Sequence, residues 1–229
     1  MGYVQCNLVV LRERYAYEFL LYCQRNQRAC PVLEVTDTGN PEPRRLAPGA
    51  DLRTDLPRYA VYRHGKRDRD APDVRNLWRD DFVAFLIGSG ITFDQALEEA
   101  GVRTTKDRWV LRTGLPTERA GRFRGPLVVT MRWLEARDAI TATQVTARFP
   151  FNHGAPLHIG DPSAIEADLA SPYFGPPVEA VPGDVVPVFW ACGVTPQEAA
   201  LQAGIDIMIT HSPGHGFVTD LRARDLALP

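Results

Sequence analysis

The first third of the chain alternates between short apolar runs and polar segments. The run CNLVVL (Cys6–Leu11) predicts a buried strand, and the apolar spacing over residues 14–26 predicts a helix. A second, short strand is predicted at Val32–Val35. Residues 36–59 are rich in proline and polar side chains, which predicts a long loop.

The middle of the chain shows a hairpin signal and then an apolar segment. YAVYRHG (residues 59–65) predicts one arm of a hairpin, and KRDRDAPD predicts a charged, solvated turn after it. DDFVAFLIG (residues 80–88) is interpreted as the start of a helical section. That section continues through TFDQALEEAG, where Thr92 and Gln95 fit a capping box and Gly101 fits a helix end. GPLVVTMRW (residues 125–133) then predicts a strand, and residues 136–149 predict a helix.

The last third predicts a strand, a helix and a strand in close succession. The strands are VPVFWAC (residues 186–192) and IDIMIT (residues 205–210), and the helix between them has Thr195 at its N-cap. This order predicts a βαβ unit with parallel strands. The fold class expected is α/β in the broad sense (mixed α+β), with a mixed sheet and a C-terminal βαβ unit. Residues 1–229 are expected to form a single domain of two intimately packed lobes, with a middle lobe inserted at about 60–130.

Composition and charge limit the classes of function and partner that this chain can have. The 26 basic and 28 acidic side chains form no basic stripe, so no nucleic-acid partner is expected. The apolar runs are too short to cross a bilayer, and the first residues lack the features of a secretory signal. The four cysteines form no CxxC pair. These features predict a cytoplasmic protein with reduced thiols and no membrane partner.

Four of the five histidines lie in two loops rich in glycine and proline. His153 and His158 share RFPFNHGAPLHIGDP with Asp161, and His211 and His215 share THSPGHG. Pro213 and Gly214 exclude a helical metal pair in the second loop. Because histidine exchanges protons near neutral pH, the four histidines and Asp161 are the candidate catalytic residues. A divalent metal on His153, His158, Asp161 or His211 stays open as an alternative, although no spacing specifies it and no cofactor is required by the sequence.

Substrate-binding candidates come from a loop and from two arginines. Cys192, Gly193 and Thr195 lie where the predicted strand meets the predicted helix, whose free N–H groups suit an anion. Arg53 and Arg112 are candidates for binding a substrate carboxylate, because guanidinium groups match carboxylates in bidentate geometry. The alternatives are a solvated ion pair for Arg53, with Asp51 and Asp55 nearby, and a small core residue for Cys192.

Several runs, taken in order, resemble the hydro-lyase family that includes the D-glutamate cyclase domain. They include LAPGADLRTDLPRYAVYRHG, LWRDDFVAFLIGSGITFDQAL, RFPFNHGAPLHIGDP, VPVFWACGVTPQ and ITHSPGHGFVTD. The resemblance implies a mixed α/β enzyme with two lobes that removes water from its substrate, as in closure of D-glutamate to 5-oxo-D-proline. Members usually carry a further segment before the part that matches GYVQCNL, where this sequence starts.

The sequence departs from the family pattern at pocket positions. Ser89-Gly90-Ile91 replaces Cys-Ser-Phe, and Leu111-Arg112-Thr113-Gly114 replaces Tyr-Arg-Thr-Asn. The expected function is elimination of water from a small carboxylate or amino-acid-like substrate, with an altered substrate in a specialised biosynthetic pathway as one form of it. The alternatives are a metal-dependent hydrolase or lyase and a non-catalytic ligand-binding descendant of the lyase fold. The sequence leaves open whether the chain forms a homo-oligomer.

Overall fold

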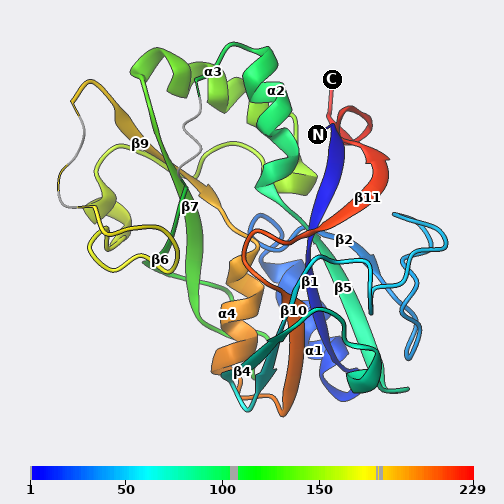
Figure 1. Ribbon diagram of the computed structural model, residues 1–229. Helices are drawn as coiled ribbons and strands as arrows, with labels where there is room; N and C mark the ends of the chain where they lie inside the picture. Colours follow the sequence, from blue (N-terminus) through cyan, green and yellow to red (C-terminus); the bar gives the residue numbers. More distant parts are fainter. Residues whose placement is uncertain (1, 104–107, 179, 181–182) are drawn as a thin grey trace.

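The computed structural model describes residues 2–103, 108–178, 180 and 183–229. These residues form two β-sheets and four α-helices (Figure 1). Each strand pair in the described residues is antiparallel. The mixed α/β class predicted from the sequence is confirmed, but the predicted mixed sheet is wrong, because both sheets are antiparallel in the described residues.

The larger sheet carries seven strands in the order β2-β5-β1-β10-β3-β4, with β11 pairing with β1. Its central strand pairs with β5 over seven registered residues, from Cys6 to Arg12. The helix α1 (Glu13–Arg25) packs on this sheet through Phe19, Tyr22 and Cys23. The strands are β1 (Tyr3–Arg12), β2 (Val32–Val35), β3 (Tyr59–Arg63), β4 (Lys66–Ala71), β5 (Phe82–Gly88), β10 (Ile207–His211) and β11 (Phe217–Arg222).

The smaller sheet has four strands in the order β6-β7-β9-β8. Two helices, α2 (Asp94–Glu99) and α3 (Ala136–Ala147), lie together at one end of the molecule (Figure 1). They pack with Leu134, Val188 and Trp190 of this sheet in one apolar cluster. The strands are β6 (Trp109–Pro116), β7 (Pro126–Leu134), β8 (His158–Ile159) and β9 (Val186–Ala191).

The helix α4 (Val194–Gln202) lies between the two sheets (Figure 1). Ala199 and Ala200 pack with Val9 and Met208 of the larger sheet. On the other side, the Thr195 hydroxyl accepts a hydrogen bond from the Val128 N–H of β7 at 3.0 Å and donates to the Val128 carbonyl at 3.2 Å. The helix therefore joins the sheets, which explains why six consecutive residues of it are buried.

The predicted strand, helix and strand of the C-terminal third are present, but the parallel βαβ unit is wrong. The first strand, β9, belongs to the smaller sheet, whereas β10 belongs to the larger one. Because α4 fills the space between the sheets, the chain enters it from one sheet and leaves it into the other. The short connections on either side of α4 are compatible with strands in two different sheets. They therefore did not establish that β9 and β10 pair in one sheet.

Two local predictions in the middle of the chain are also wrong. The segment interpreted as the start of a helix is strand β5, whose seven residues are all buried. A strand buried on both faces shows no alternation, so its apolar run resembles that of a buried helix. The segment interpreted as a charged turn is β4, an edge strand that pairs with β3 alone and carries Lys66, Arg67 and Arg69. Charged edge strands of this kind resist pairing with other chains.

The predicted helix caps are shifted. The Thr92 hydroxyl accepts from the Gln5 N–H of β1 at 3.0 Å, and α2 starts two residues later without a side-chain cap. Gly193, not Thr195, occupies the N-cap of α4. Gly101 follows α2 with a φ of +77°, as the predicted helix end requires.

None of the helices in the described residues is long and apolar enough to cross a membrane.

Candidate functional site

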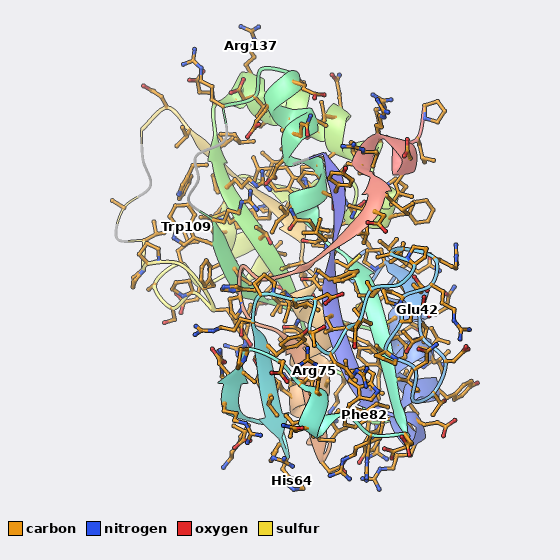
Figure 2. The ribbon with its side chains drawn as sticks, turned by 45° about the vertical axis from the view of Figure 1, so that its right-hand side comes forward. Glu42, His64, Arg75, Phe82, Trp109 and Arg137 are labelled. Atoms are coloured by element: carbon orange, nitrogen blue, oxygen red, sulfur yellow. The ribbon has the colours of Figure 1, made fainter. Side chains whose placement is uncertain are left out.

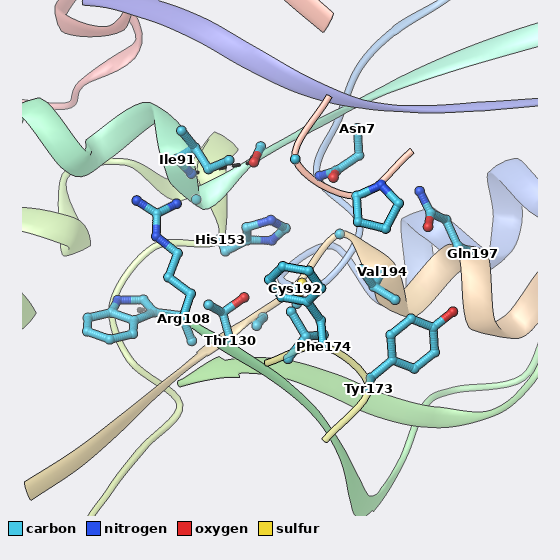
Figure 3. Close-up of a pocket in the computed structure, with 18 of the residues that line it drawn as sticks. Asn7, Ile91, Arg108, Thr130, His153, Tyr173, Phe174, Cys192, Val194 and Gln197 are labelled. Carbon is cyan, nitrogen blue, oxygen red and sulfur yellow. Dashed lines mark hydrogen bonds between the residues drawn. The ribbon is translucent and has the colours of Figure 1, made fainter. Parts of the chain in front are cut away.

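A pocket of about 240 Å³ lies between the two sheets, beside the start of α4. The loops after β5, β9 and β10 all reach it, through residues 89–91 and 93, residues 192–194 and residues 213–214. Tyr173 and Phe174 close another side (Figure 3). The structure therefore brings the two predicted loops after β9 and β10 together, although by a different topology from the predicted one.

Arg132 is the most unusual residue of this pocket. It lies on β7, is 2 % exposed, and its guanidinium carbon is 5.4 Å from the ring centres of both Phe93 and Trp190. Its Nη2 donates to Asp94 at 2.7 Å, but Nε and Nη1 meet no hydrogen-bond acceptor in the described part of the chain. Buried donors without acceptors cost free energy, so this side chain needs an acceptor from outside the chain.

Asp94 holds two guanidinium groups at the pocket. Its second carboxylate oxygen pairs with Arg108, which also lines the pocket. Burial and the charge of Arg108 lower the pKa of Arg132, and Asp94 opposes both effects. Arg67 of β4 also lines the pocket, but it pairs with Asp70 at 2.5 Å and neighbours Tyr62 and Tyr173. Arg108 and Arg132 share the single carboxylate of Asp94, so this group carries a net positive charge and suits an anion.

His153 lies in the pocket in the left-handed backbone region, with φ of 78°. Its Nδ1 is 3.0 Å from the Arg28 carbonyl oxygen, which can only accept, so Nδ1 carries a proton. Burial lowers the pKa of His153 to about 4, against the opposing effect of the Arg28 and Gly88 carbonyls. At neutral pH the ring is uncharged, and its Nε2 is the nitrogen with a lone pair.

His211, at the end of β10, has the opposite tautomer. The Leu8 backbone N–H donates to its Nδ1 at 3.2 Å, and the Gln197 amide nitrogen is 3.3 Å from the same atom. A backbone N–H can only donate, so Nδ1 is the acceptor and Nε2 carries the proton. Burial lowers the pKa of His211 to about 4, against the opposing effect of the Leu8 backbone, and the nearby His215 adds a smaller lowering effect. His211 is therefore a neutral hydrogen-bond donor.

Cys192 and Gly193 also line the pocket. Burial raises the pKa of the Cys192 thiol, although the Thr130 hydroxyl and the Val194 backbone N–H act in the opposite direction. The thiol form is therefore favoured over the thiolate, which is the nucleophilic form. Gly193 has no room for a side chain, because a Cβ there would lie 2.0 Å from the Asn7 amide nitrogen.

The other histidine candidates lie outside the lining of this pocket. His158 stacks on Phe189 at 5.6 Å between ring centres, and its Nε2 is 2.7 Å from the Asp161 carbonyl oxygen. The Asp161 carboxylate accepts from the Ser163 N–H at 2.9 Å, which lowers the pKa of that carboxyl. His215 is exposed at its ring, with Nδ1 2.8 Å from the Pro213 carbonyl oxygen.

The remaining substrate-binding candidates make contacts within the chain. Arg53 forms an ion pair with Asp51 at 2.8 Å, two residues away. Arg112 pairs with Glu198 at 3.2 Å and stacks on Tyr173 at 4.7 Å, so it lies behind one wall of the pocket. Thr195 binds Val128, as described above, and is fully buried.

The described residues contain no group of three or more histidine, cysteine, aspartate or glutamate side chains placed to hold a metal ion. In particular, His153 and His211 line the pocket while His158 and Asp161 do not. The four residues considered as metal ligands are therefore divided between two places.

Arg132, Arg108 and Asp94 were missed by the sequence analysis, but one signal was available. Arg132 interrupts the apolar strand GPLVVTMRWL, in which its neighbours Met131 and Trp133 are buried. A charged residue in a buried strand is costly unless it has a partner or a ligand. Asp94, which follows the 3-10 turn Gly90–Phe93, carried no comparable signal because acidic residues are common at helix starts.

Comparisons with known proteins place the chain in a family. The model of the D-glutamate cyclase family matches residues 83–220, which include Arg132, His153 and His211. A relative from Stutzerimonas stutzeri is 52% identical over 99% of this chain and 88% of its own length. A relative from Geobacillus kaustophilus has the same identity and coverage, and one from Bacillus subtilis is 48% identical over 99% of this chain and 90% of its own. Each of the three is named "Putative hydro-lyase". The resemblance found in the sequence is confirmed, and the chain belongs to the D-glutamate cyclase family.

Proposed function

We propose that this protein eliminates water from a small carboxylate substrate, by dehydration or by dehydrative cyclisation. The observation that carries the proposal is Arg132, a buried guanidinium at the pocket whose Nε and Nη1 need an acceptor. A substrate carboxylate would satisfy them, with Arg108 adding charge on the same side. Membership of the D-glutamate cyclase family supports the reaction type.

The two neutral histidines suit the proton transfers that loss of water requires. His153 accepts a proton from the substrate nitrogen or carbon at Nε2, and the negative charge of the bound carboxylate offsets the cost of a buried imidazolium. In dehydration, a C=C bond forms as the C–O bond breaks, and the proton taken from carbon passes to the departing hydroxide to give water. In cyclisation, the substrate ammonium gives up two protons and forms a C–N bond to the carboxyl carbon, and one carboxylate oxygen leaves with these two protons as water. His211 donates a hydrogen bond from Nε2 to the oxygen on which charge develops, as a neutral imidazole can.

The test is mass spectrometry of the purified protein incubated with D- and L-amino dicarboxylates and hydroxy acids, in which loss of one water is measured. Arg132→Met should raise KM by about 30-fold or more, because hydrogen bonds to charged groups contribute about 1.5–3 kcal/mol each. His153→Asn should lower kcat by about 100-fold or more.

Arg137→Met is the matched control, because Arg137 points away from the molecule on α3 (Figure 2). It should retain the activity of the unmodified protein. An Arg132→Met variant with unchanged KM would contradict the proposal. Binding of carboxylates without loss of water by the folded protein would favour the non-catalytic alternative.

A further inference from the structure

Arg28 contacts the loop of His153 through two different groups. It lies three residues beyond the end of α1, and its backbone carbonyl oxygen is 3.0 Å from Nδ1 of His153. Its side chain reaches the same loop further along, where Nη2 donates to the carbonyl oxygens of Ala155 at 2.5 Å and Pro156 at 2.8 Å. One residue therefore binds both the histidine ring and the backbone that follows it.

The backbone of this loop has a conformation that needs support from outside. His153 and Gly154 are both in the left-handed region, with φ of 78° and 68°. A side chain other than glycine persists in that region where the surrounding structure determines it. The far end of the loop is fixed at Leu157, whose N–H donates to the Phe189 carbonyl of β9 at 2.7 Å. The guanidinium of Arg28 binds the two carbonyls that lie between Gly154 and Leu157.

The carbonyl of Arg28 is held in place without the help of its side chain. The N–H groups of Ala29 and Cys30 both donate to the Asn26 carbonyl, at 3.0 and 2.9 Å, and form a turn. The Asn26 side chain exchanges two hydrogen bonds of 2.8 Å with the backbone of Glu118. Since the Arg28 side chain is exposed, it can be replaced without disturbing this turn.

We propose that Arg28 is a positioning residue for His153, whose loop its guanidinium holds so that the ring stays on the Arg28 carbonyl. This inference rests on the function proposed above, in which Nε2 of His153 accepts a proton. Nε2 has a free lone pair as long as the proton stays on Nδ1, and the carbonyl keeps it there. Without the guanidinium the loop can shift, and a ring that leaves the carbonyl populates both tautomers.

Nuclear magnetic resonance on the intact chain, with histidine labelled by nitrogen-15, tests the positioning without relying on turnover. At neutral pH the unmodified protein should show two well-separated nitrogen signals for His153, from a protonated Nδ1 and an unprotonated Nε2. The signals are assigned by their loss in His153→Asn. In Arg28→Met they should move towards each other, because the two tautomers then average. Arg28→Lys, which keeps a charged donor, should restore most of the separation.

Kinetics on the same variants separate a shifted ring from weakened substrate binding. Arg28→Met should lower kcat by about tenfold or more, because misplacing a reacting group by about 1 Å can cost 100-fold. KM should change less than about twofold, since Asp94, Arg108 and Arg132 are untouched. Arg28→Lys should keep kcat within about threefold of the unmodified protein.

Arg25→Met is the matched control, because Arg25 is an exposed arginine at the end of α1 that donates to the Arg119 carbonyl instead. It should leave both the histidine signals and kcat unchanged, and thermal unfolding should show that all variants are folded. The proposal is overturned if Arg28→Met keeps the separated signals, or if Arg25→Met averages them equally. Averaged signals in an unmodified protein would also overturn it.

Failure of the proposed function would look different. If the unmodified protein removes water from no substrate, the histidine signals still decide whether Arg28 positions the ring. If Arg28→Met averages the signals of an active protein and kcat is unchanged, the positioning stands and the role of His153 as the base is wrong.

Discussion

His153 and His211 line one pocket as neutral rings of opposite tautomers. The Arg28 carbonyl requires a proton on Nδ1 of His153, and the Leu8 N–H requires a lone pair on Nδ1 of His211. Each tautomer is fixed by a backbone group that has a single hydrogen-bonding role. The Nε2 atoms of the two rings are therefore complementary, one an acceptor and the other a donor.

Because His153 and His211 are buried as neutral rings, the free energy of unfolding should decrease as the pH is lowered. Both pKa values are lowered from 6.5 to about 4 in the folded state. As the pH falls from about 6.5 to about 4, the unfolded chain takes up these protons and the folded chain does not. The free energy of unfolding should therefore decrease by about 2 kcal/mol per histidine between pH 7 and pH 5. Urea unfolding at the two pH values measures this.

His153→Asn and His211→Asn should each flatten that pH dependence by about 2 kcal/mol, because the titrating ring is removed. Asparagine tolerates the left-handed backbone of His153. His64→Asn is the control, since His64 also has positive φ but points outward at the β3–β4 turn (Figure 2). A pH dependence that is the same in all four proteins would show that these rings are not held neutral.

Asp94→Asn should destabilise the protein, because the bridging carboxylate separates two like charges. The variant leaves Arg108 and the buried Arg132 without their shared counter-ion. Loss of one partner of a buried ion pair costs about 3–5 kcal/mol, and the lower end is expected because Asp94 is not fully buried. Chemical unfolding measures the change.

Added sulfate should restore part of the stability of Asp94→Asn, because an anion that binds the two guanidinium groups stabilises the folded state. Asp138→Asn provides the control. Asp138 lies in the first turn of α3 and contacts the Arg103 N–H rather than a guanidinium of the pocket. An equal response of both variants to sulfate would argue against a specific anion site at Arg132.

The sequence predicted local elements well where one physical signal dominated. Val32–Val35 is a strand with the predicted bounds, and α3 ends at Ala147, before Pro150. The pattern failed at β5, because a strand buried on both faces has no periodicity to read. It also could not show that β9 and β10 join different sheets, since that depends on α4 filling the space between them.

The candidate site could likewise be predicted only in part from the sequence. The two histidine loops were identified from glycine and proline content, and each contributes one histidine to the pocket lining, His153 and His211. Their neighbours His158 and His215 had the same sequence signal, and only the path of each loop separates them from the pocket. The candidate Arg53 was chosen from a loop and Arg112 lies on the edge strand β6, whereas Arg132 lies on the interior strand β7. Its charge within an apolar run was the more informative feature.

Gly88→Ala should be strongly destabilising and should reduce activity. A Cβ at Gly88 would lie 1.9 Å from the Phe151 carbonyl oxygen, a backbone atom that cannot rotate away. The loop that carries Asn152 and His153 would have to move, at a cost of about 3 kcal/mol. Gly183→Ala is the control, because a Cβ there meets nothing within 4 Å. Equal melting temperatures for the two variants would contradict this close approach.

Gly193→Ala should act through Asn7, and a double-mutant cycle can separate this contact from a general effect on α4. The new Cβ would lie 2.0 Å from the Asn7 amide nitrogen, so the amide must leave Gly88. The single variant should lose about 1–3 kcal/mol of stability. In Asn7→Ala/Gly193→Ala the clashing amide is absent, so the double variant should be no less stable than Asn7→Ala alone. Chemical unfolding of the four proteins gives the coupling free energy, which should be clearly non-additive. Additive losses would place the cost of Gly193→Ala in the helix N-cap rather than in its contact with Asn7.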